Sequence, residues 1–166
     1  MRRHGLAKRA PHRMFSERVA GRANRVSNHI PISAITSTME QPTAYKILIV
    51  DDDPFILDMY VLKFKEQGFT IEIARDGKEG ITKNESFQPD IILLDAVMPI
   101  MDGFDMLKEI KKSPAHPVKT ILLTNLGQKE DVDRGLALGA DAYIIKAHFT
   151  PTEVVEKVKK LLSGHE

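Results

Sequence analysis

One stretch of the chain joins an apolar run to three aspartates and a proline: Lys46-Ile-Leu-Ile-Val-Asp-Asp-Asp-Pro54. The run from Lys46 to Val50 has the length and composition of a buried β-strand. Pro54 has no backbone N–H to donate, so it favours the first turn of a helix. The stretch therefore predicts a strand, a short acidic loop and a helix, in that order.

The same pattern of strand followed by helix repeats along the rest of the chain. Four further apolar runs have the length of strands and cover residues 70–74, 91–94, 118–123 and 142–145. Helices are expected over residues 54–67, 78–87, 103–112, 128–138 and 151–162. Such alternation favours an α/β fold in which helices cover both faces of a parallel sheet. We predict a flavodoxin-like, doubly wound (βα)5 domain with a five-stranded parallel sheet in the order 2-1-3-4-5. In this order the run 70–74, which carries Glu72 between two isoleucines, is an edge strand.

Composition excludes several classes of protein. The chain has 166 residues, of which 42% are hydrophobic and 28% charged, as in an ordinary globular domain. It has no cysteine, which excludes disulfide frameworks and thiol chemistry and favours a reducing, cytoplasmic compartment. No apolar run approaches the roughly 18 residues of a membrane span, so we expect no membrane association.

Charge divides the chain into two parts. The first 45 residues carry eight Lys or Arg and only Glu17 and Glu40, a net charge of +6, whereas the remainder has a net charge of −5. We predict a disordered basic extension over residues 1–44 and one domain over residues 45–164. The extension is a basic arm that contacts nucleic acid or an acidic surface, an inert tail, or sequence upstream of a true start at Met39. Its Arg-rich, acid-poor composition also resembles an organelle transit peptide.

Polar residues follow four of the five predicted strands at the point where each strand ends. They are Asp51, Asp52 and Asp53 after the first strand, Asp95 after the third, Thr124 after the fourth and Lys146 after the fifth. The carboxyl ends of parallel strands meet at one edge of the sheet, and ligands bind beyond that edge. We therefore expect these side chains to converge, although they come from positions nearly 100 residues apart.

Clustered carboxylates require a cation. Two like charges about 4 Å apart repel by roughly 4 kcal/mol at an effective dielectric constant near 20. A site of oxygen ligands without Cys or His suits Mg²⁺. A metal, a carboxylate nucleophile, a hydroxyl and a lysine are the parts of a phosphoryl-transfer site with an aspartyl-phosphate intermediate. The alternative, solvated aspartates at helix N-termini, accounts for each residue singly but not for their joint appearance after four strands.

At these positions the sequence resembles the receiver domain of two-component response regulators, from about Lys46 to Leu162. The resemblance rests on residues 47–54, 89–104, 122–124 and 138–146. It implies that Asp95 accepts a phosphoryl group from a phosphohistidine of a sensor histidine kinase or phosphotransfer protein. It also implies the ligands of Mg²⁺, which are Asp51, Asp52, Asp95 and the backbone carbonyl of Val97, with Asp53 as a neighbour only.

The resemblance further implies a switch. Thr124 bonds a phosphoryl oxygen, Lys146 pairs with the acyl phosphate, and Tyr143 turns inward as the switch aromatic. The face formed by the fourth helix, the fifth strand and the fifth helix then passes between two packings and contacts a downstream protein target. The helix at 54–67 has more apolar residues than one core stripe needs, and in response regulators this helix commonly docks the kinase.

The sequence departs from the family pattern around the site. Ala147 follows Lys146 where the family usually has proline, often in a cis bond, so the position of Lys146 is the least secure transfer from the family. His148 is a solvated loop residue or a modulator of the phosphate site. Val97 and Leu126, two residues after Asp95 and Thr124, are apolar and cannot orient a water molecule. We therefore predict slow self-dephosphorylation.

Two other functions compete with this interpretation. A phosphohydrolase with its nucleophile at Asp51 is disfavoured, because Phe55 stands where that chemistry expects Thr or Val. A phosphorylation-independent interaction module, supported only by Ala147, is the stronger alternative. We expect a regulatory protein rather than an enzyme, with only intrinsic autophosphorylation and autodephosphorylation. Because the sequence stops soon after the last predicted helix, we expect a stand-alone receiver that is a monomer or a phosphorylation-dependent dimer, with nucleic acid contacted only through the basic extension.

Overall fold

The computed structural model describes residues 44–112 and 114–164. Apart from Ala44, the predicted basic extension lies outside the described residues, and so does the possible start at Met39. The predictions for that segment therefore remain predictions.

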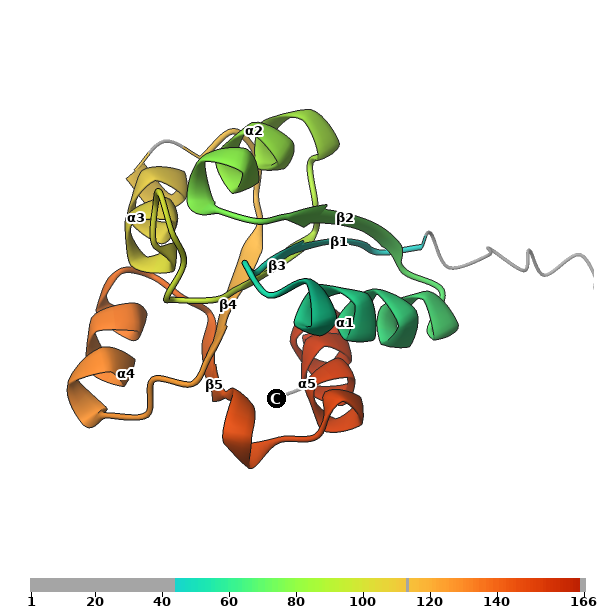
Figure 1. Ribbon diagram of the computed structural model, residues 1–166. Helices are drawn as coiled ribbons and strands as arrows, with labels where there is room; N and C mark the ends of the chain where they lie inside the picture. Colours follow the sequence, from blue (N-terminus) through green and yellow to red (C-terminus); the bar gives the residue numbers. More distant parts are fainter. Residues whose placement is uncertain (1–43, 113, 165–166) are drawn as a thin grey trace, which may run out of the picture. The chain divides into compact units, whose positions relative to one another are not determined.

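In the described part of the chain, five parallel strands form one sheet in the order β2-β1-β3-β4-β5, so that β2 and β5 are its edges (Figure 1). This order confirms the predicted topology. The strands are β1 (Lys46–Val50), β2 (Thr70–Ala74), β3 (Ile91–Leu94), β4 (Lys119–Thr124) and β5 (Ala142–Ile145). Apart from the exposed Lys46, the residues of β1 and β3 are buried, whereas β2 is only partly buried. Glu72 of β2 lies near Lys83, 3.6 Å from Oε1 to Nζ.

Within residues 44–112 and 114–164, five α-helices cover the two faces of this sheet. They are α1 (Pro54–Glu66), α2 (Gly77–Phe87), α3 (Gly103–Lys112), α4 (Lys129–Ala137) and α5 (Pro151–Ser163). In Figure 1, α1 and α5 lie together on one face, and α2 and α3 lie on the other. The 3-10 turn η2 (Lys146–His148) links β5 to the segment before α5.

Each face of the sheet has its own hydrophobic core, because side chains alternate along every strand. Ile47, Ile49 and Ile144 point to the α1–α5 side, where they pack with Phe64 and Val158. The other face joins Leu48, Val50 and Leu122 to residues of α3, including Met106 and Leu107. The sheet is therefore packed on both faces, and sites built on the strands of such a scaffold are positioned precisely.

The sequence-based boundaries are close to the observed ones. Four strands match, but the fourth runs from Lys119 to Thr124, because Thr124 is itself buried and pairs with Ile145 instead of following the strand. Helix α2 begins at Gly77 rather than residue 78, since the Asp76 carboxylate accepts hydrogen bonds from Lys78 and Glu79 N–H and so caps the helix one residue earlier. Helices α1, α4 and α5 differ from prediction by one residue at one or both ends, as fraying termini do.

The excess of apolar residues in α1 is confirmed as an outward face. Phe55 is 82% exposed and Leu62 is 58% exposed, and they lie seven residues apart on one side of the helix. Leu57, Tyr60 and Phe64 occupy the buried side. None of the helices in the described part of the chain has the length and apolarity needed to cross a membrane.

Candidate functional site

The register of the sheet places Asp51 beside Asp95. Val50 of β1 is the partner of Leu94 of β3, and each aspartate comes directly after one of these residues. The Asp95 N–H donates to the Val50 carbonyl at 2.9 Å, which continues the ladder past the last paired residues. Two carboxylates far apart in sequence are thus fixed next to each other by backbone pairing.

Three carboxylates meet at this edge of the sheet. One oxygen from each of Asp51, Asp52 and Asp95 lies within 4.8 Å of the other two. Asp51 is 3% exposed, the side chain of Asp95 is 12% exposed, and Asp52 faces solvent. A set of carboxylate oxygens with one side open to water fits a hard divalent cation such as Mg²⁺.

The carboxylates already contact one cation of the protein. Lys146 Nζ donates to Asp51 Oδ2 at 2.5 Å and to Asp95 Oδ2 at 2.7 Å, and the Lys146 side chain is only 12% exposed. The turn η2 holds Lys146 in this position with Ala147, rather than proline, as its next residue. The structure therefore brings Lys146 to the aspartates, which is the least secure element of the sequence-based site.

Burial and pairing act on these groups in opposite directions. Burial raises the pKa of the Asp51 carboxyl, and the hydrogen bonds from Lys146 and the Asp53 N–H only partly offset it. Burial also disfavours the charge on Lys146, but the hydrogen bonds to Asp51 and Asp95 prevail and raise the pKa of its ammonium group. The lysine thus stays charged and offsets part of the carboxylate repulsion.

In the part of the chain that the structure describes, no hydrogen bond joins Thr124 or Tyr143 to the three aspartates. Thr124 is 1% exposed, and its hydroxyl accepts from the Leu126 N–H at 3.4 Å. The Tyr143 hydroxyl donates to the Leu126 carbonyl at 3.0 Å, and its ring lies between β5 and α4. Burial raises the pKa of the Tyr143 phenol. Both side chains therefore converge on the loop after β4 rather than on the aspartates.

The rim of the site is apolar. Val97 is 58% exposed and Ile100 73% exposed in the loop after Asp95, and Phe55 stands at the start of α1. The Val97 N–H donates to Asp95 Oδ1 at 3.2 Å, while the metal-ligand role of its carbonyl stays a prediction. Ile100 has a φ of 70°, a left-handed conformation that β-branched residues rarely adopt. Ile100 is thus a strained and exposed apolar residue in the loop that follows Asp95.

Two further residues, Gly103 and Tyr60, contribute to the site. A Cβ on Gly103 would lie 2.0 Å from the Asp95 carbonyl oxygen, so only glycine fits where α3 begins beside Asp95. The sequence indicates Tyr60 only as part of an apolar helix. Burial raises the pKa of the Tyr60 phenol. The positive charge of Lys146 lowers this pKa in part, and the negative charge of Asp51 raises it further. The sequence offers one further hint: Tyr60 belongs to the helix that directly follows Asp51 and Asp52.

Asp53 is not part of the carboxylate cluster. Its side chain accepts from the Phe55 N–H at 2.9 Å and caps α1. The exposed His148 lies in η2, and no contact of its ring with the aspartates is found among the described residues.

The sequence of this chain is similar to those of known proteins. The family model described as the response regulator receiver domain matches residues 47–159. The DNA-binding response regulator MtrA of Mycolicibacterium smegmatis is 34% identical over 121 residues, which are 73% of this chain and 52% of that protein. The chain spans about half the length of the curated relatives it matches.

Solved structures give the same picture at the level of the fold. A CheY-like response regulator receiver domain protein from Methanospirillum hungatei is 35% identical, with a TM-score of 0.68 over 74% of this chain and 97% of that one. The CheX–CheY–BeF3–Mg²⁺ complex from Borrelia burgdorferi includes a chain that is 31% identical, with a TM-score of 0.66 over 70% of this chain and 88% of that one.

Proposed function

The chain belongs to the response regulator receiver family, whose domains are regulatory and interact with histidine kinases and downstream effectors, and on this basis we propose that it is a phosphorylation switch with Asp95 as its phosphoacceptor. One observation carries the proposal. The carboxylates of Asp51, Asp52 and Asp95 and the ammonium group of Lys146 meet at the carboxyl edge of the sheet.

Asp51, Asp52 and Asp95 would hold Mg²⁺, with the Val97 carbonyl as a further ligand. Their oxygen donors and partial exposure fit this ion, and Mg²⁺ is a component of the similar Borrelia burgdorferi complex. When bound, Mg²⁺ neutralises charge on the phosphoryl oxygens. Lys146 contributes a second positive charge, and it needs no metal to stay next to Asp95.

The proposed reaction is transfer from a phosphohistidine. An Asp95 carboxylate oxygen attacks the phosphorus, the bond from phosphorus to the imidazole nitrogen breaks, and the nitrogen keeps its electron pair. The Asp95 N–H bond to Val50 and the Val97 N–H bond to Asp95 Oδ1 orient the carboxylate for this attack. Lys146, which contacts Asp51 and Asp95, would then pair with the acyl phosphate.

The switch would run through Thr124 and Tyr143. A phosphoryl group adds up to about two negative charges and three acceptor oxygens. The Thr124 hydroxyl, held by the Leu126 N–H, would turn to one of these oxygens and release that loop. Because Tyr143 bonds the Leu126 carbonyl, the loop movement reaches α4 and β5, the face expected to contact a downstream target. A stand-alone output through that face stays a prediction.

Helix α1 would provide the docking face for the histidine kinase or phosphotransfer protein. Its exposed Phe55 and Leu62 form an apolar stripe that leads from the mouth of the site. With both residues changed to alanine, phosphoryl transfer from a cognate kinase would slow, whereas labelling by acetyl phosphate would keep its rate. Such kinase contact would take place in the cytoplasm.

The apolar rim would make the phosphoryl group long-lived. Hydrolysis needs a positioned water, and neither Val97 nor the half-buried Leu126 offers a polar atom on its side chain to hold one. We expect a phospho-Asp95 half-life on the order of minutes or longer. The change Val97→Asn, which adds an amide, would shorten it, and a lifetime of seconds in the unaltered protein would contradict the interpretation.

Intact-mass measurement tests the proposed function. The full chain is incubated with acetyl phosphate, with and without Mg²⁺, beside Asp95→Asn and the neighbouring control Asp53→Asn. The proposal expects a gain of one phosphoryl group that requires Mg²⁺ and Asp95 and that survives the change at Asp53. No gain under conditions that label another receiver would favour a phosphorylation-independent interaction module.

A further inference from the structure

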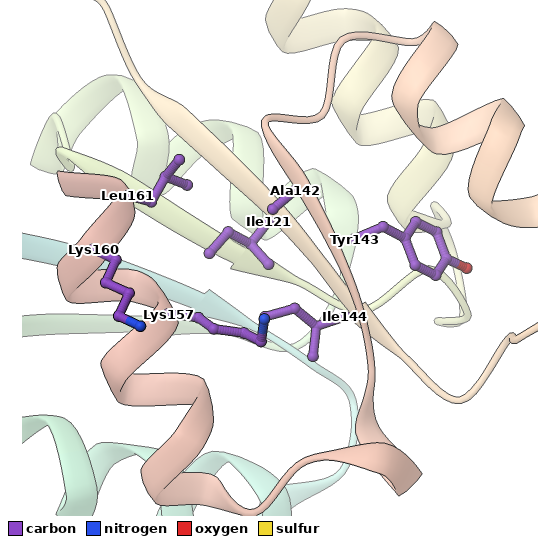
Figure 2. Close-up of a pocket in the computed structure, with 7 residues that line it drawn as sticks. All are labelled: Ile121, Ala142, Tyr143, Ile144, Lys157, Lys160 and Leu161. Carbon is purple, nitrogen blue, oxygen red and sulfur yellow. The ribbon is translucent and has the colours of Figure 1, made fainter. Parts of the chain in front are cut away.

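Two hollows on opposite faces of the sheet differ in the charges that line them. One has a volume of about 280 Å³ and lies between β5 and α5, where Lys157 and Lys160 stand over aliphatic side chains (Figure 2). The other, which we call the α2–α3 hollow, has a volume of about 170 Å³. Its lining residues are Ile81, Asn84, Glu85, Glu109, Ile110 and Ala115. The α2–α3 hollow therefore combines two carboxylates and an amide with aliphatic walls.

The α2–α3 hollow lies at the amino edge of the sheet, opposite the edge that carries the aspartates. Both helices begin near the carboxyl edge and run back toward the amino edge, because each connects two parallel strands. Asn84 and Glu85 lie in the last turn of α2, and Glu109 and Ile110 lie in the last turn of α3. The hollow is thus separate from the proposed phosphoryl-transfer site.

Asn84 is the residue that marks this hollow as a binding site. It is only 4% exposed, and its Oδ1 atom is buried without a hydrogen-bond partner among residues 44–112 and 114–164. An unpaired buried amide costs free energy relative to an apolar side chain of the same shape, and such groups are rare in native proteins. Because Oδ1 is an acceptor, the missing partner is a hydrogen-bond donor.

The two glutamates add negative charge that the protein itself does not neutralise. In the part of the chain that the structure describes, neither Glu85 nor Glu109 forms a salt bridge, and both are exposed. The last turn of α2 contains no basic residue. The C-terminal end of a helix carries partial negative charge, which disfavours a carboxylate there and favours a cation. The hollow therefore favours a positively charged donor.

The walls of the hollow favour an organic cation over a metal ion. Ca²⁺ takes about six or more oxygen ligands, and Mg²⁺ requires octahedral geometry. The side chains of Ile81 and Ile110 offer no ligand atom, but they suit the methylene groups of an aliphatic chain. A guanidinium group has several N–H donors in one plane, enough for both carboxylates and the Asn84 amide, and it is weakly hydrated.

We propose that the α2–α3 hollow binds a guanidinium group on an aliphatic chain, with Glu85 and Glu109 as carboxylate partners and Asn84 as a hydrogen-bond acceptor. A free alkylguanidine and an arginine side chain of another protein both present this group, with the same fork of N–H donors. An alkylammonium group is disfavoured, because its compact, strongly hydrated charge does not match a carboxylate through two parallel N–H bonds. Binding at this hollow does not rest on the proposed phosphoryl transfer.

Titration of the unphosphorylated full chain with matched probes tests the proposal. Butylguanidine, butylamine, the blocked peptide acetyl-Gly-Arg-Gly-amide and CaCl₂ are added separately, and backbone amide NMR shifts are followed. We expect saturable shifts in the last turns of α2 and α3 with a guanidinium probe, and binding of butylamine that is weaker by about fivefold or more. Tighter binding of butylguanidine would identify a free ligand, and tighter binding of the peptide would identify an arginine side chain. Either result supports the proposal.

Charge variants separate the hollow from the general charge of the surface. Glu85→Gln with Glu109→Gln should weaken the guanidinium probes by about tenfold or more. The matched control, Asp58→Asn with Glu130→Gln, removes the same charge from exposed positions outside the hollow. This control should change the affinity by less than about twofold.

The change Asn84→Leu separates ligand binding from a structural role of the amide. Leucine removes an unpaired buried polar group, so the melting temperature of the free protein should stay constant or rise, while affinity for the guanidinium probes falls by about threefold or more. A lower melting temperature with unchanged affinity would show a structural role and contradict the proposal. The proposal is also overturned if neither guanidinium probe binds, if butylamine or CaCl₂ binds as tightly, or if the double glutamine variant binds the probes unchanged.

Discussion

The two helices that flank the edge strand β5 are held in very different ways. Helix α5 has 13 residues, a capping box at Thr150 and four buried side chains, Val154, Val155, Val158 and Leu161. Helix α4 has nine residues, no side-chain hydrogen bond at its N-cap Gln128, and Gly135 as its one buried residue. Burial and capping therefore anchor α5, while α4 rests on the sheet with little of either.

This difference indicates which element a signal at the sheet edge can displace. Segments with few buried apolar contacts open at low free energy, and moving elements of switches come from that group. Helix α4 lies between Thr124 and Lys146 in sequence, and the Tyr143–Leu126 hydrogen bond links its leading loop to β5. We infer that phosphorylation of Asp95 would shift α4 and leave α5 in place.

The largest expected effect is on the free energy of unfolding when a leucine of each helix is changed to alanine. Leu161→Ala removes a buried side chain of α5 and should lower the free energy of unfolding by about 2–3 kcal/mol. Leu136→Ala removes a side chain of α4 that is 47% exposed and should cost less than about 0.5 kcal/mol. Urea unfolding measures both changes. Equal losses would mean that α4 is anchored as firmly as α5.

A methyl group at Gly135 should disturb the contact of α4 with the sheet. A Cβ there would lie 2.5 Å from Leu122 Cδ1 and 3.0 Å from Tyr143 Cδ2. Alanine favours the helix by about 1 kcal/mol over glycine, but overpacking costs about 1–3 kcal/mol. We expect Gly135→Ala to destabilise the protein by about 1 kcal/mol in urea unfolding. A gain in stability would show that α4 already moves away from the sheet at little cost.

The helix caps offer a smaller, matched test. Thr150→Ala removes the hydroxyl that accepts from the Glu153 N–H and should cost about 1 kcal/mol. Gln128→Ala removes no capping bond and should change stability by a few tenths of a kcal/mol. Gln128→Asp, which supplies a cap, should stabilise by about 0.5–1 kcal/mol. Thermal unfolding of the three variants at one pH compares them directly.

The smallest effect concerns pH. Hydrogen bonds from the Thr150 N–H and hydroxyl lower the pKa of Glu153 below its ordinary value. The unfolded chain therefore binds this proton more readily, so the capping box stabilises the fold above about pH 4 and is lost as the pH falls further. Glu153→Gln should flatten this part of the profile of melting temperature between about pH 3 and 7. An unchanged profile would show that the cap adds no pH-dependent stability.

The sequence predicts the strands and the sheet topology better than it predicts individual side-chain contacts. Apolar runs bounded by polar residues located β1, β2, β3 and β5, because strand burial is a property of neighbouring residues. The acidic edge followed from topology, since parallel strands end at one place. The contacts of Lys146 with both Asp51 and Asp95 depend on side-chain torsion angles, which the pattern of apolar and polar residues does not predict.

Local backbone conformation was the least predictable feature. The turn η2 is too short to have a period, and Ala147 in it signals only that proline is missing. Ile100 and Gln88 both have positive φ angles that neither residue type favours. Such positions are set by the surrounding structure, as where Gly103 approaches Asp95 and closes the loop that contains Ile100.

Hydrogen–deuterium exchange tests the central claim most directly. The full chain and Asp95→Asn are followed with and without acetyl phosphate and Mg²⁺. We expect amides of α4 to exchange roughly tenfold or more faster than those of α5. On phosphorylation, exchange should change in α4 and the loop after β4, should stay constant in α5, and should not respond in Asp95→Asn. Equal protection of the two helices, or a response to phosphorylation centred on α5, would contradict the account.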